Sequence, residues 1–216
     1  MKKDNPKNLY IGIVGILAFV LWTITIQCAD LQAIGPNRSV VGFGTLNRYI
    51  QNLFGVHMTL YVITDWLGLV PIAFAFGFAI LGLIQWIKRK RILKVDFSIL
   101  ILGGFYLIVM AVYILFEYVV VNYRPVLING YLEASYPSST TMLVMCVMPT
   151  AITQLRSRIK KNGLKMMVTL LISAFIAFMV LGRLASGVHW FTDILGGAFV
   201  STGLVALYRF VCNLKV

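Results

Sequence analysis

Long apolar runs, separated by short polar segments, make up most of the chain. Several of these runs have the length and composition of a helix that spans a lipid bilayer, with few or no charges over some eighteen residues. Six runs follow one another, at approximately residues 9–28, 60–87, 97–121, 139–155, 166–182 and 191–212. The pattern predicts an all-α fold, a bundle of six transmembrane helices.

The first run follows a basic segment, an arrangement that is also found in cleaved signal peptides. The run from Leu9 to Cys28 is long for a signal peptide, and the pattern of small residues that marks a cleavage site is missing. We therefore expect an uncleaved first span.

Basic residues are unevenly divided between the two sides of such a bundle. Six spans place both termini on one side, and that side holds fifteen of the nineteen Lys and Arg residues. Three of them precede the first span, five follow the second, five follow the fourth and two lie at the carboxyl end. Since loops rich in Lys and Arg stay in the cytoplasm, both termini are expected to be cytoplasmic.

The four remaining basic residues, Arg38, Arg48, Arg124 and Arg183, then lie on the outward side. The chain divides into three expected regions: 1–28, the cytoplasmic amino terminus and first transmembrane helix; 29–58, an extracytoplasmic interfacial loop; and 59–216, a five-helix membrane core. Glycine and proline interrupt the loop repeatedly, and its apolar residues indicate a segment that lies at the membrane surface.

Composition agrees with a membrane protein and argues against a nucleic-acid-binding protein. Hydrophobic residues make up 60% of the chain and charged residues only 12%, whereas soluble domains carry about 25% charged residues. The net charge of +12 comes mainly from short loops between spans. No long basic face with interleaved aromatic residues is present, so nucleic acid is not an expected partner.

The three cysteines, Cys28, Cys146 and Cys212, fall in or at the edges of apolar runs. Their spacing suits neither a metal site nor a disulfide framework. We expect them to behave as small buried hydrophobic residues.

The start of the sixth run carries the first candidate chemistry. His189 and Asp193 are four residues apart and would share a face of a helix. A carboxylate there accepts the Nδ1 proton of the imidazole and leaves Nε2 free as a nucleophile. Gly187 allows a turn that would bring Arg183 back to the same place. The alternative is a set of interfacial side chains that anchor a helix end; an ionisable residue such as Asp193 within a span favours function.

A second stretch, from Pro137 through Ser138, Ser139 and Thr140, has the composition of a helix start. Free N–H groups at a helix start bind anions, although a plain Ser/Thr cap is the simpler explanation for this stretch alone. Arg124 adds a guanidinium fork suited to phosphate, or else an arginine that reaches from the membrane to water. Together these residues describe a site for a tetrahedral oxyanion beside a histidine, with no cluster of metal ligands.

These residues resemble the motifs of the type 2 phosphatidic acid phosphatase family, over roughly residues 55–212. The membrane members of that family have six spans and an outward-facing site. The third family motif, Arg-x5-His-x3-Asp, is matched in full by Arg183, His189 and Asp193. Motif order, the gaps between motifs and the expected topology also agree.

The other two motifs are matched in part. The first, Lys-x6-Arg-Pro, is matched by Arg124 and Pro125, with Glu117 at the Lys position. The second, Pro-Ser-Gly-His, is matched by Pro137 and Ser138, with Ser139 in place of Gly and Thr140 in place of His. In the family the missing His is the general acid and the missing Lys is a phosphate ligand.

The resemblance implies roles for the matched residues. His189 attacks phosphorus to form a phosphohistidine, and Asp193 orients it. The expected phosphate-binding residues are Arg124, Ser138, Ser139 and Arg183. His57 is a candidate for a substitute proton donor, and a surface histidine is the alternative. Glu117 either pairs with one of the two arginines, is protonated in the membrane, or points away.

The loss of the general acid bears on the substrate. General acid catalysis contributes about 10²- to 10⁴-fold and matters most for a poor leaving group. A phosphate leaving from a diphosphate has a second pKa near about 6, so it departs without a proton donor. We therefore expect a lipid phosphatase with its active site on the extracytoplasmic side of the cell membrane. Its substrate would be a lipid phosphate or, by this argument, a polyprenyl diphosphate, and no cofactor or metal is expected.

Two other functions stay open at this point. A phosphotransferase would pass the phosphoryl group from the same histidine to a lipid or sugar acceptor. A catalytically impaired member would bind or transport a phospholipid, which the two altered motifs would explain.

Overall fold

The structure, a computed structural model, describes residues 5–214. Three basic residues counted on the predicted cytoplasmic side, Lys2, Lys3 and Lys215, lie outside the described residues, as do the outermost residues of the predicted regions 1–28 and 59–216. The helices are α1 (Asn5–Ile26), α2 (Gly44–Phe54), α3 (Met58–Leu67), α4 (Leu69–Arg89), α5 (Phe97–Tyr118), α6 (Ser139–Arg158), α7 (Asn162–Ala185) and α8 (Phe191–Asn213), with short 3₁₀ turns η1 (Pro36–Arg38) and η2 (Ile92–Lys94). The expected all-α fold is confirmed: within residues 5–214 only isolated β-bridges occur.

Within residues 5–214, five segments are long and apolar enough to cross a membrane, which makes the chain an integral membrane protein. They are Pro6–Ile26, Met58–Arg89, Phe97–Tyr118, Asn162–Ala185 and Phe191–Asn213. The second of these joins α3 and α4, which meet at Gly68. Five of the six predicted spans are therefore confirmed by length and composition.

Helix α6 is not among these five, and the count of six spans stays a prediction. Its 20 residues would rise about 30 Å, enough for a bilayer core. It packs against α4, α5, α7 and α8 and buries polar side chains such as Thr150 and Gln154. Because its neighbours cover it, α6 needs less apolar surface than a helix that faces lipid.

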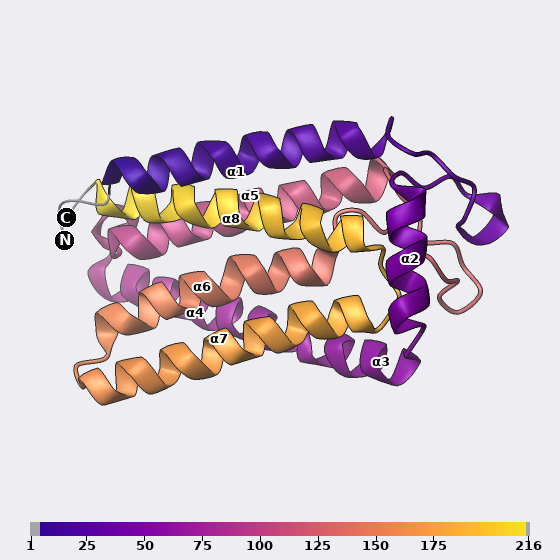
Figure 1. Ribbon diagram of the computed structural model, residues 1–216. Coiled ribbons are helices and arrows are strands. Elements are labelled where there is room, and N and C mark those ends of the chain that lie inside the picture. Colours follow the sequence, from indigo (N-terminus) through magenta and orange to yellow (C-terminus); the bar gives the residue numbers. More distant parts are fainter. Residues whose placement is uncertain (1–4, 215–216) are drawn as a thin grey trace.

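The helices lie side by side, and the connections gather at two ends of the bundle (Figure 1). At one end lie the start of α1, the end of α8, and the α4–α5 and α6–α7 connections, where most of the basic residues lie. At the other end α2 crosses the bundle beside the end of α7 and the starts of α6 and α8. The candidate site residues therefore share one end. Which side of the membrane this end faces stays a prediction.

Helices α1 and α8 pack antiparallel in close contact along their lengths. Small residues allow this approach: a Cβ added at Gly15 would lie 2.7 Å from Cα of Gly203. Small residues at helix interfaces let backbones approach closely in membranes, where packing rather than the hydrophobic effect drives association. This contact joins the first span to the helix that carries Asp193.

The cysteines depart from the prediction at one position. Cys146 is buried and Cys212 is half-buried, but Cys28 is exposed. Helix α1 ends at Ile26, so Cys28 lies in the turn that follows rather than on a packed helix face. The expectation of a buried Cys28 was wrong.

Candidate active site

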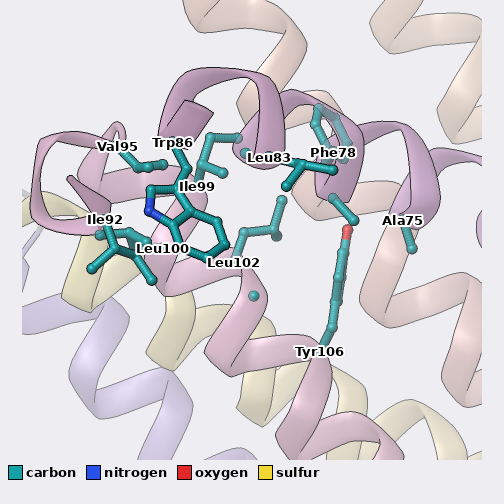
Figure 2. Close-up of a pocket in the computed structure, with 13 residues that line it drawn as sticks. Ala75, Phe78, Leu83, Trp86, Ile92, Val95, Ile99, Leu100, Leu102 and Tyr106 are labelled. Carbon is teal, nitrogen blue, oxygen red and sulfur yellow. The ribbon is translucent and has the colours of Figure 1, made fainter. Parts of the chain in front are cut away.

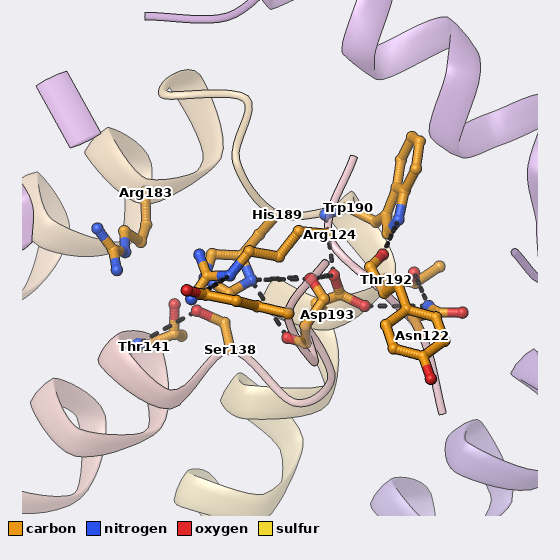
Figure 3. A network of polar contacts seen from close by, with 12 residues as sticks. Asn122, Arg124, Ser138, Thr141, Arg183, His189, Trp190, Thr192 and Asp193 are labelled. Atoms are coloured by element: carbon orange, nitrogen blue, oxygen red, sulfur yellow. Dashed lines mark hydrogen bonds and ion pairs between the residues drawn. The ribbon is translucent and has the colours of Figure 1, made fainter. Parts of the chain in front are cut away.

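Three chain segments bring the candidate residues together at one end of the bundle (Figure 3). The α7–α8 connection carries His189, and the first turn of α8 carries Asp193. The α5–α6 connection carries Arg124, and Ser138 caps the start of α6. The side chains of these four residues are buried.

His189 lies in the connection before α8, two residues ahead of Phe191 where the helix begins. The expectation that His189 and Asp193 share a face of one helix is therefore wrong: a local turn before α8 places His189. Gly187 makes this turn with a φ of +68°, and a Cβ there would lie 1.9 Å from the carbonyl oxygen of Gly55. The chain can take this path only because residue 187 has no side chain.

The His189 ring reaches Asp193 mainly through Ser135. Nδ1 of His189 lies 3.9 Å from Oδ2 of Asp193, too far for a hydrogen bond. Oγ of Ser135 lies 3.1 Å from Nδ1 and donates to the same carboxylate oxygen. The carbonyl oxygen of Ser135 lies 3.2 Å from Nδ1 as well. The hydroxyl of Ser135 therefore links the imidazole to the carboxylate.

Asp193 is fully buried and held by further donors. Its Oδ1 accepts a hydrogen bond from Nδ2 of Asn122 at 3.0 Å, and its Oδ2 accepts one from the backbone N–H of Trp190 at 2.9 Å. Its carbonyl oxygen accepts one from the backbone N–H of Ser138 at 3.0 Å. A buried carboxylate is stable only when it is paired in this way. These bonds fix the start of α8 against the start of α6.

Arg124 faces the other ring nitrogen of His189. Nη1 of Arg124 lies 3.3 Å from Nε2 of His189. A guanidinium only donates hydrogen bonds, so Nε2 is the acceptor and the ring proton resides on Nδ1. Burial, followed by the charges of Arg124 and Arg183, holds the pKa of His189 well below its ordinary value of 6.5. The imidazole is thus neutral, with the Nε2 lone pair directed toward a guanidinium group.

Arg124 is itself held by Glu133. Nε of Arg124 lies 3.0 Å from Oε2 of Glu133. The backbone N–H of Arg124 also donates to the carbonyl oxygen of Glu133 at 3.0 Å. The two residues face each other across the hairpin-like α5–α6 connection, where Tyr123 and Ala134 form a β-bridge. This pairing keeps the Arg124 fork beside His189.

Arg183 is buried but bonded to α3 rather than to His189. Nη1 lies 3.2 Å from Oγ1 of Thr64 and 3.3 Å from the carbonyl oxygen of Tyr61. Nη2 lies 3.2 Å from Oδ1 of Asp65. The guanidinium also stacks 4.7 Å from the centre of the Tyr61 ring. Figure 3 shows Arg183 standing apart from the hydrogen-bonded group around Asp193.

The α6 start supplies further polar groups. Oγ of Ser138 accepts a hydrogen bond from the backbone N–H of Thr141 at 3.5 Å, so the predicted helix start is confirmed. Within residues 5–214, Oγ1 of Thr141 and Nε of Arg183 are buried and have no hydrogen-bond partner. Unpartnered polar groups of this kind beside a helix start suit an oxyanion.

Ser139 and Thr140 share one cavity, and Ser139 also lines a second. Ser139 lines the small cavity that also reaches His189, Ser135 and Glu117. Both Ser139 and Thr140 line a larger apolar cavity between α4, α5 and α6. Thr140 is not among the residues that line the His189 cavity.

Glu117 lies near the end of α5, exposed, on the small cavity that reaches His189. Of the alternatives left by the sequence, pairing with an arginine does not hold in the structure. Within residues 5–214, Arg124 pairs with Glu133 and Arg183 pairs with Asp65. Glu117 instead hydrogen-bonds with the side chain of Tyr113, so its carboxylate lies near the site without an arginine partner.

His57 does not reach the site cavity. Its ring is exposed, and Nε2 lies 2.8 Å from the carbonyl oxygen of Phe54. Its backbone N–H donates to the carbonyl oxygen of Ser186 at 2.9 Å. Of the two alternatives for His57, the structure shows the surface histidine.

Sequence reasoning missed several residues that hold the site together. They are Ser135, Asn122, Glu133, Asp65 and Tyr61. One signal was available, since Asp65 interrupts an apolar run and ionisable residues in spans are usually functional. The others are ordinary polar or aromatic residues whose roles follow from three-dimensional neighbours. No three His, Cys, Asp or Glu residues of the described part gather as metal ligands would.

Part of the chain matches a known protein superfamily. Residues 117–214 match the family model of the PAP2 superfamily. No curated protein matches the chain in sequence. The fold is similar to the crystal structure of the first transmembrane PAP2 type phosphatidylglycerolphosphate phosphatase from Bacillus subtilis, with a TM-score of 0.55 and 20% identity, covering 93% of this chain and 94% of that chain. At this identity the likeness shows a shared fold.

Proposed function

The chain belongs to the type 2 phosphatidic acid phosphatase (PAP2) superfamily, and we propose that it is a membrane phosphatase that cleaves a lipid phosphate or diphosphate through a phosphohistidine at His189. One observation carries this proposal. Nδ1 of His189 lies 3.1 Å from Oγ of Ser135 and Nε2 lies 3.3 Å from Nη1 of Arg124, which only donates, so the ring proton is assigned to Nδ1 and the lone pair to Nε2. A neutral, oriented imidazole beside a guanidinium is the arrangement that phosphoryl transfer to nitrogen requires.

The reaction proceeds in two steps. In the first, the Nε2 lone pair attacks phosphorus while the bond to the leaving oxygen breaks, and the electron pair departs with that oxygen. The ring gains positive charge, which the relay from Nδ1–H through Ser135 to Asp193 stabilises. In the second, water attacks phosphorus, the P–N bond breaks, and the electron pair returns to Nε2. The water gives up one proton to solvent, and phosphate leaves.

The phosphoryl oxygens are assigned to groups around His189. Arg124 binds one oxygen through its fork, because a planar guanidinium matches phosphate geometry. Ser138 and the N–H groups of Ser139 and Thr140 provide donors at the start of α6. Arg183, whose Nε is buried without a hydrogen-bond partner among residues 5–214, supplies the second positive charge. No metal is needed for this charge stabilisation.

A chain of apolar cavities supports a lipid as substrate. A cavity of about 430 Å³ shares Tyr113, Ser139 and Met142 with the small cavity at His189. A second cavity, of about 310 Å³ between α4 and α5, shares Ala75 and Tyr106 with the first (Figure 2). Together they lead from the catalytic residues toward the opposite end of the bundle. A hydrocarbon chain fits this lining, and its phosphate end would then lie beside Nε2.

The preferred substrate class is a lipid diphosphate such as a polyprenyl diphosphate. Thr140 stands where the family has its general acid and does not line the His189 cavity. A leaving phosphate needs no proton donor, whereas an alkoxide does. The test is phosphate release by purified protein from a polyprenyl diphosphate and from phosphatidic acid, with His189→Ala as the blank. Faster release from the diphosphate supports the proposal, and faster release from phosphatidic acid contradicts it.

The active site is proposed to face away from the cytoplasm. The basic connections lie at the opposite end of the bundle from His189 (Figure 1), and such connections stay in the cytoplasm. A cysteine introduced at exposed Tyr131, in the α5–α6 connection, should react with a membrane-impermeant maleimide in intact cells after Cys28 is replaced by Ser. Labelling only after the membrane is opened would show that the active site faces the cytoplasm and contradict the proposal.

A second candidate is a phospholipid-binding member without catalysis. It is favoured by the carboxylate of Glu117 on the His189 cavity, which no arginine pairs, and by the loss of the family's general acid. In that case His189→Ala would leave the cellular phenotype intact. A phosphotransferase would use the same residues, and product analysis with and without an added lipid or sugar alcohol distinguishes it from a hydrolase.

A further inference from the structure

Helix α2 lies across the catalytic end of the bundle and contacts the chain that carries His189 (Figure 1). Its Asn47 is only 1% exposed. Nδ2 of Asn47 donates to Oγ1 of Thr192 at 3.0 Å and to the carbonyl oxygen of Gly42 at 2.8 Å. The backbone N–H of Thr192 donates back to Oδ1 of Asn47 at 3.3 Å. A single buried amide thus makes reciprocal bonds to the first turn of α8.

Thr192 directly precedes Asp193, so these bonds act on the carboxylate's own turn. The first N–H groups of a helix have no partner within the helix, and Asn47 supplies one from a different element. Oγ1 of Thr192 also lies 3.5 Å from Nδ2 of Asn122, the amide that donates to Asp193. A polar chain therefore runs from α2 to the catalytic carboxylate.

The other side of the His189 loop is held by the same part of the protein. Nε2 of Gln51, one helical turn after Asn47, donates to the carbonyl oxygen of Gly187 at 3.0 Å. The backbone N–H of His57 donates to the carbonyl oxygen of Ser186 at 2.9 Å. The loop is thus bonded to residues 47–57 both before and after His189. Asn47, Gln51 and His57 lie outside the segment 117–214 that matches the superfamily, whereas their partners in the loop lie inside it.

We propose that Asn47 and Gln51, both on α2, are positioning residues. Their hydrogen bonds to the loop that carries His189 set the orientation of the His189 ring. The inference rests on the proposed function, since it assigns these side chains to the His189 nucleophile. Neither residue would touch the substrate. Asn47 acts through Thr192 on Asp193, and Gln51 acts through Gly187 on the turn before His189. The phosphate-binding groups Arg124 and Arg183 are not among their partners.

The role predicts a loss in the chemical step with little change in substrate binding. Asn47→Ala should lower kcat by about 10- to 100-fold, because displacing a nucleophile by about 1 Å lowers the rate roughly 10²-fold. KM should change by less than about threefold, because uniform binding is retained. Thr192→Val, which removes the hydroxyl that Asn47 bonds, should reproduce the defect, and Thr192→Ser, which restores a hydroxyl, should recover most of the activity.

Asn52→Ala is the matched control, because Asn52 is the same residue type on the same helix and is exposed. It should keep wild-type kcat. The experiment measures steady-state kinetics, burst formation of phosphohistidine and thermal unfolding for each variant in one detergent. If Asn47→Ala does not fold, Thr192→Val carries the same test.

The results separate the two claims. Wild-type kcat in Asn47→Ala and Thr192→Val, with an inactive His189→Ala, would overturn the positioning role and leave the proposed function in place. A defect confined to KM, or one that tracks a loss of thermal stability, would also overturn it. If the wild-type protein shows no His189-dependent phosphate release, the proposed function is wrong and the positioning role falls with it.

Discussion

Nδ1 of His189 and Oδ2 of Asp193 are 3.9 Å apart, and the hydroxyl of Ser135 makes the connection between them. The proton that fixes the imidazole tautomer is therefore held by a serine, which is in turn oriented by the buried carboxylate. Ser135 belongs to the α5–α6 connection, the same segment that carries Arg124. The position of this connection relative to α8 therefore determines the contacts of both ring nitrogens of His189.

Replacement of Ser135 by Ala should lower kcat by about 10- to 100-fold, because a hydrogen bond to a charged group contributes roughly 1.5–3 kcal/mol. The ring would keep the carbonyl oxygen of Ser135 as a partner but lose the link to Asp193. Ser135→Thr, which keeps a hydroxyl, should retain more activity. Steady-state kinetics on both variants provides the measurement. Equal activity in the wild type and Ser135→Ala would mean that the carbonyl contact alone orients the ring.

Arg124 should contribute to both binding and the chemical step. Arg124→Ala is expected to lower kcat/KM by at least about 10²-fold, the usual cost of removing one donor to a developing oxyanion. Arg48→Ala is a suitable control, since Arg48 is an exposed arginine on α2 at the same end of the bundle. The two variants should be assayed at low substrate concentration. Similar losses in both would show that general positive charge, rather than the Arg124 fork, is what matters.

The pH dependence of kcat/KM should report the depressed pKa of His189. Burial, then the charges of Arg124 and Arg183, lowers this pKa well below 6.5. The neutral ring is the nucleophile, so activity persists as the pH falls through 6.5 and is lost only further to the acid side. The profile must be corrected for the ionisation of the substrate, whose second phosphate pKa is near about 6. A midpoint at or above 6.5 after correction would contradict the neutral buried imidazole.

The α1–α8 contact gives a prediction for stability. Gly15→Ala places a Cβ 2.7 Å from Cα of Gly203, and backbone cannot move aside cheaply, so we expect a loss of about 1–3 kcal/mol in the free energy of unfolding. Gly77→Ala is the control, because a Cβ there meets nothing within 4 Å, and Ala is favoured over Gly in a helix by about 0.5–1 kcal/mol. Denaturant unfolding in detergent measures both. A stable Gly15→Ala variant would mean that the two helices are less tightly packed than described.

The apolar pattern predicted the all-α fold because each span needs a long uncharged run, and five runs satisfy this requirement in the structure. For α6 the span stays a prediction, because this helix is covered by its neighbours and buries polar residues such as Gln154. High hydropathy is expected of a helix that faces lipid, whereas α6 is surrounded by other helices. The division of the second run into α3 and α4 follows from Gly68, one of the interrupting residues visible in the sequence.

The candidate site was predictable where one short motif carries several side chains. His189 and Asp193 are four residues apart in the sequence, so their proximity follows from local geometry even though His189 precedes the helix. Ser135 and Asn47 could not be predicted, because their partners lie 54 and 145 positions away. Arg183 shows the opposite case. Its motif predicts a phosphate ligand, whereas its hydrogen bonds run to residues of α3.

The central claim is that His189 becomes phosphorylated on Nε2. The most direct measurement is brief incubation of the purified protein with a polyprenyl diphosphate carrying a labelled terminal phosphate, quenching in alkali, and mapping of the label by mass spectrometry. We expect an alkali-stable, acid-labile phosphate on the peptide that contains His189, and none in His189→Ala. Labelled phosphate released at the same rate by His189→Ala, or label found on another residue, would contradict the account.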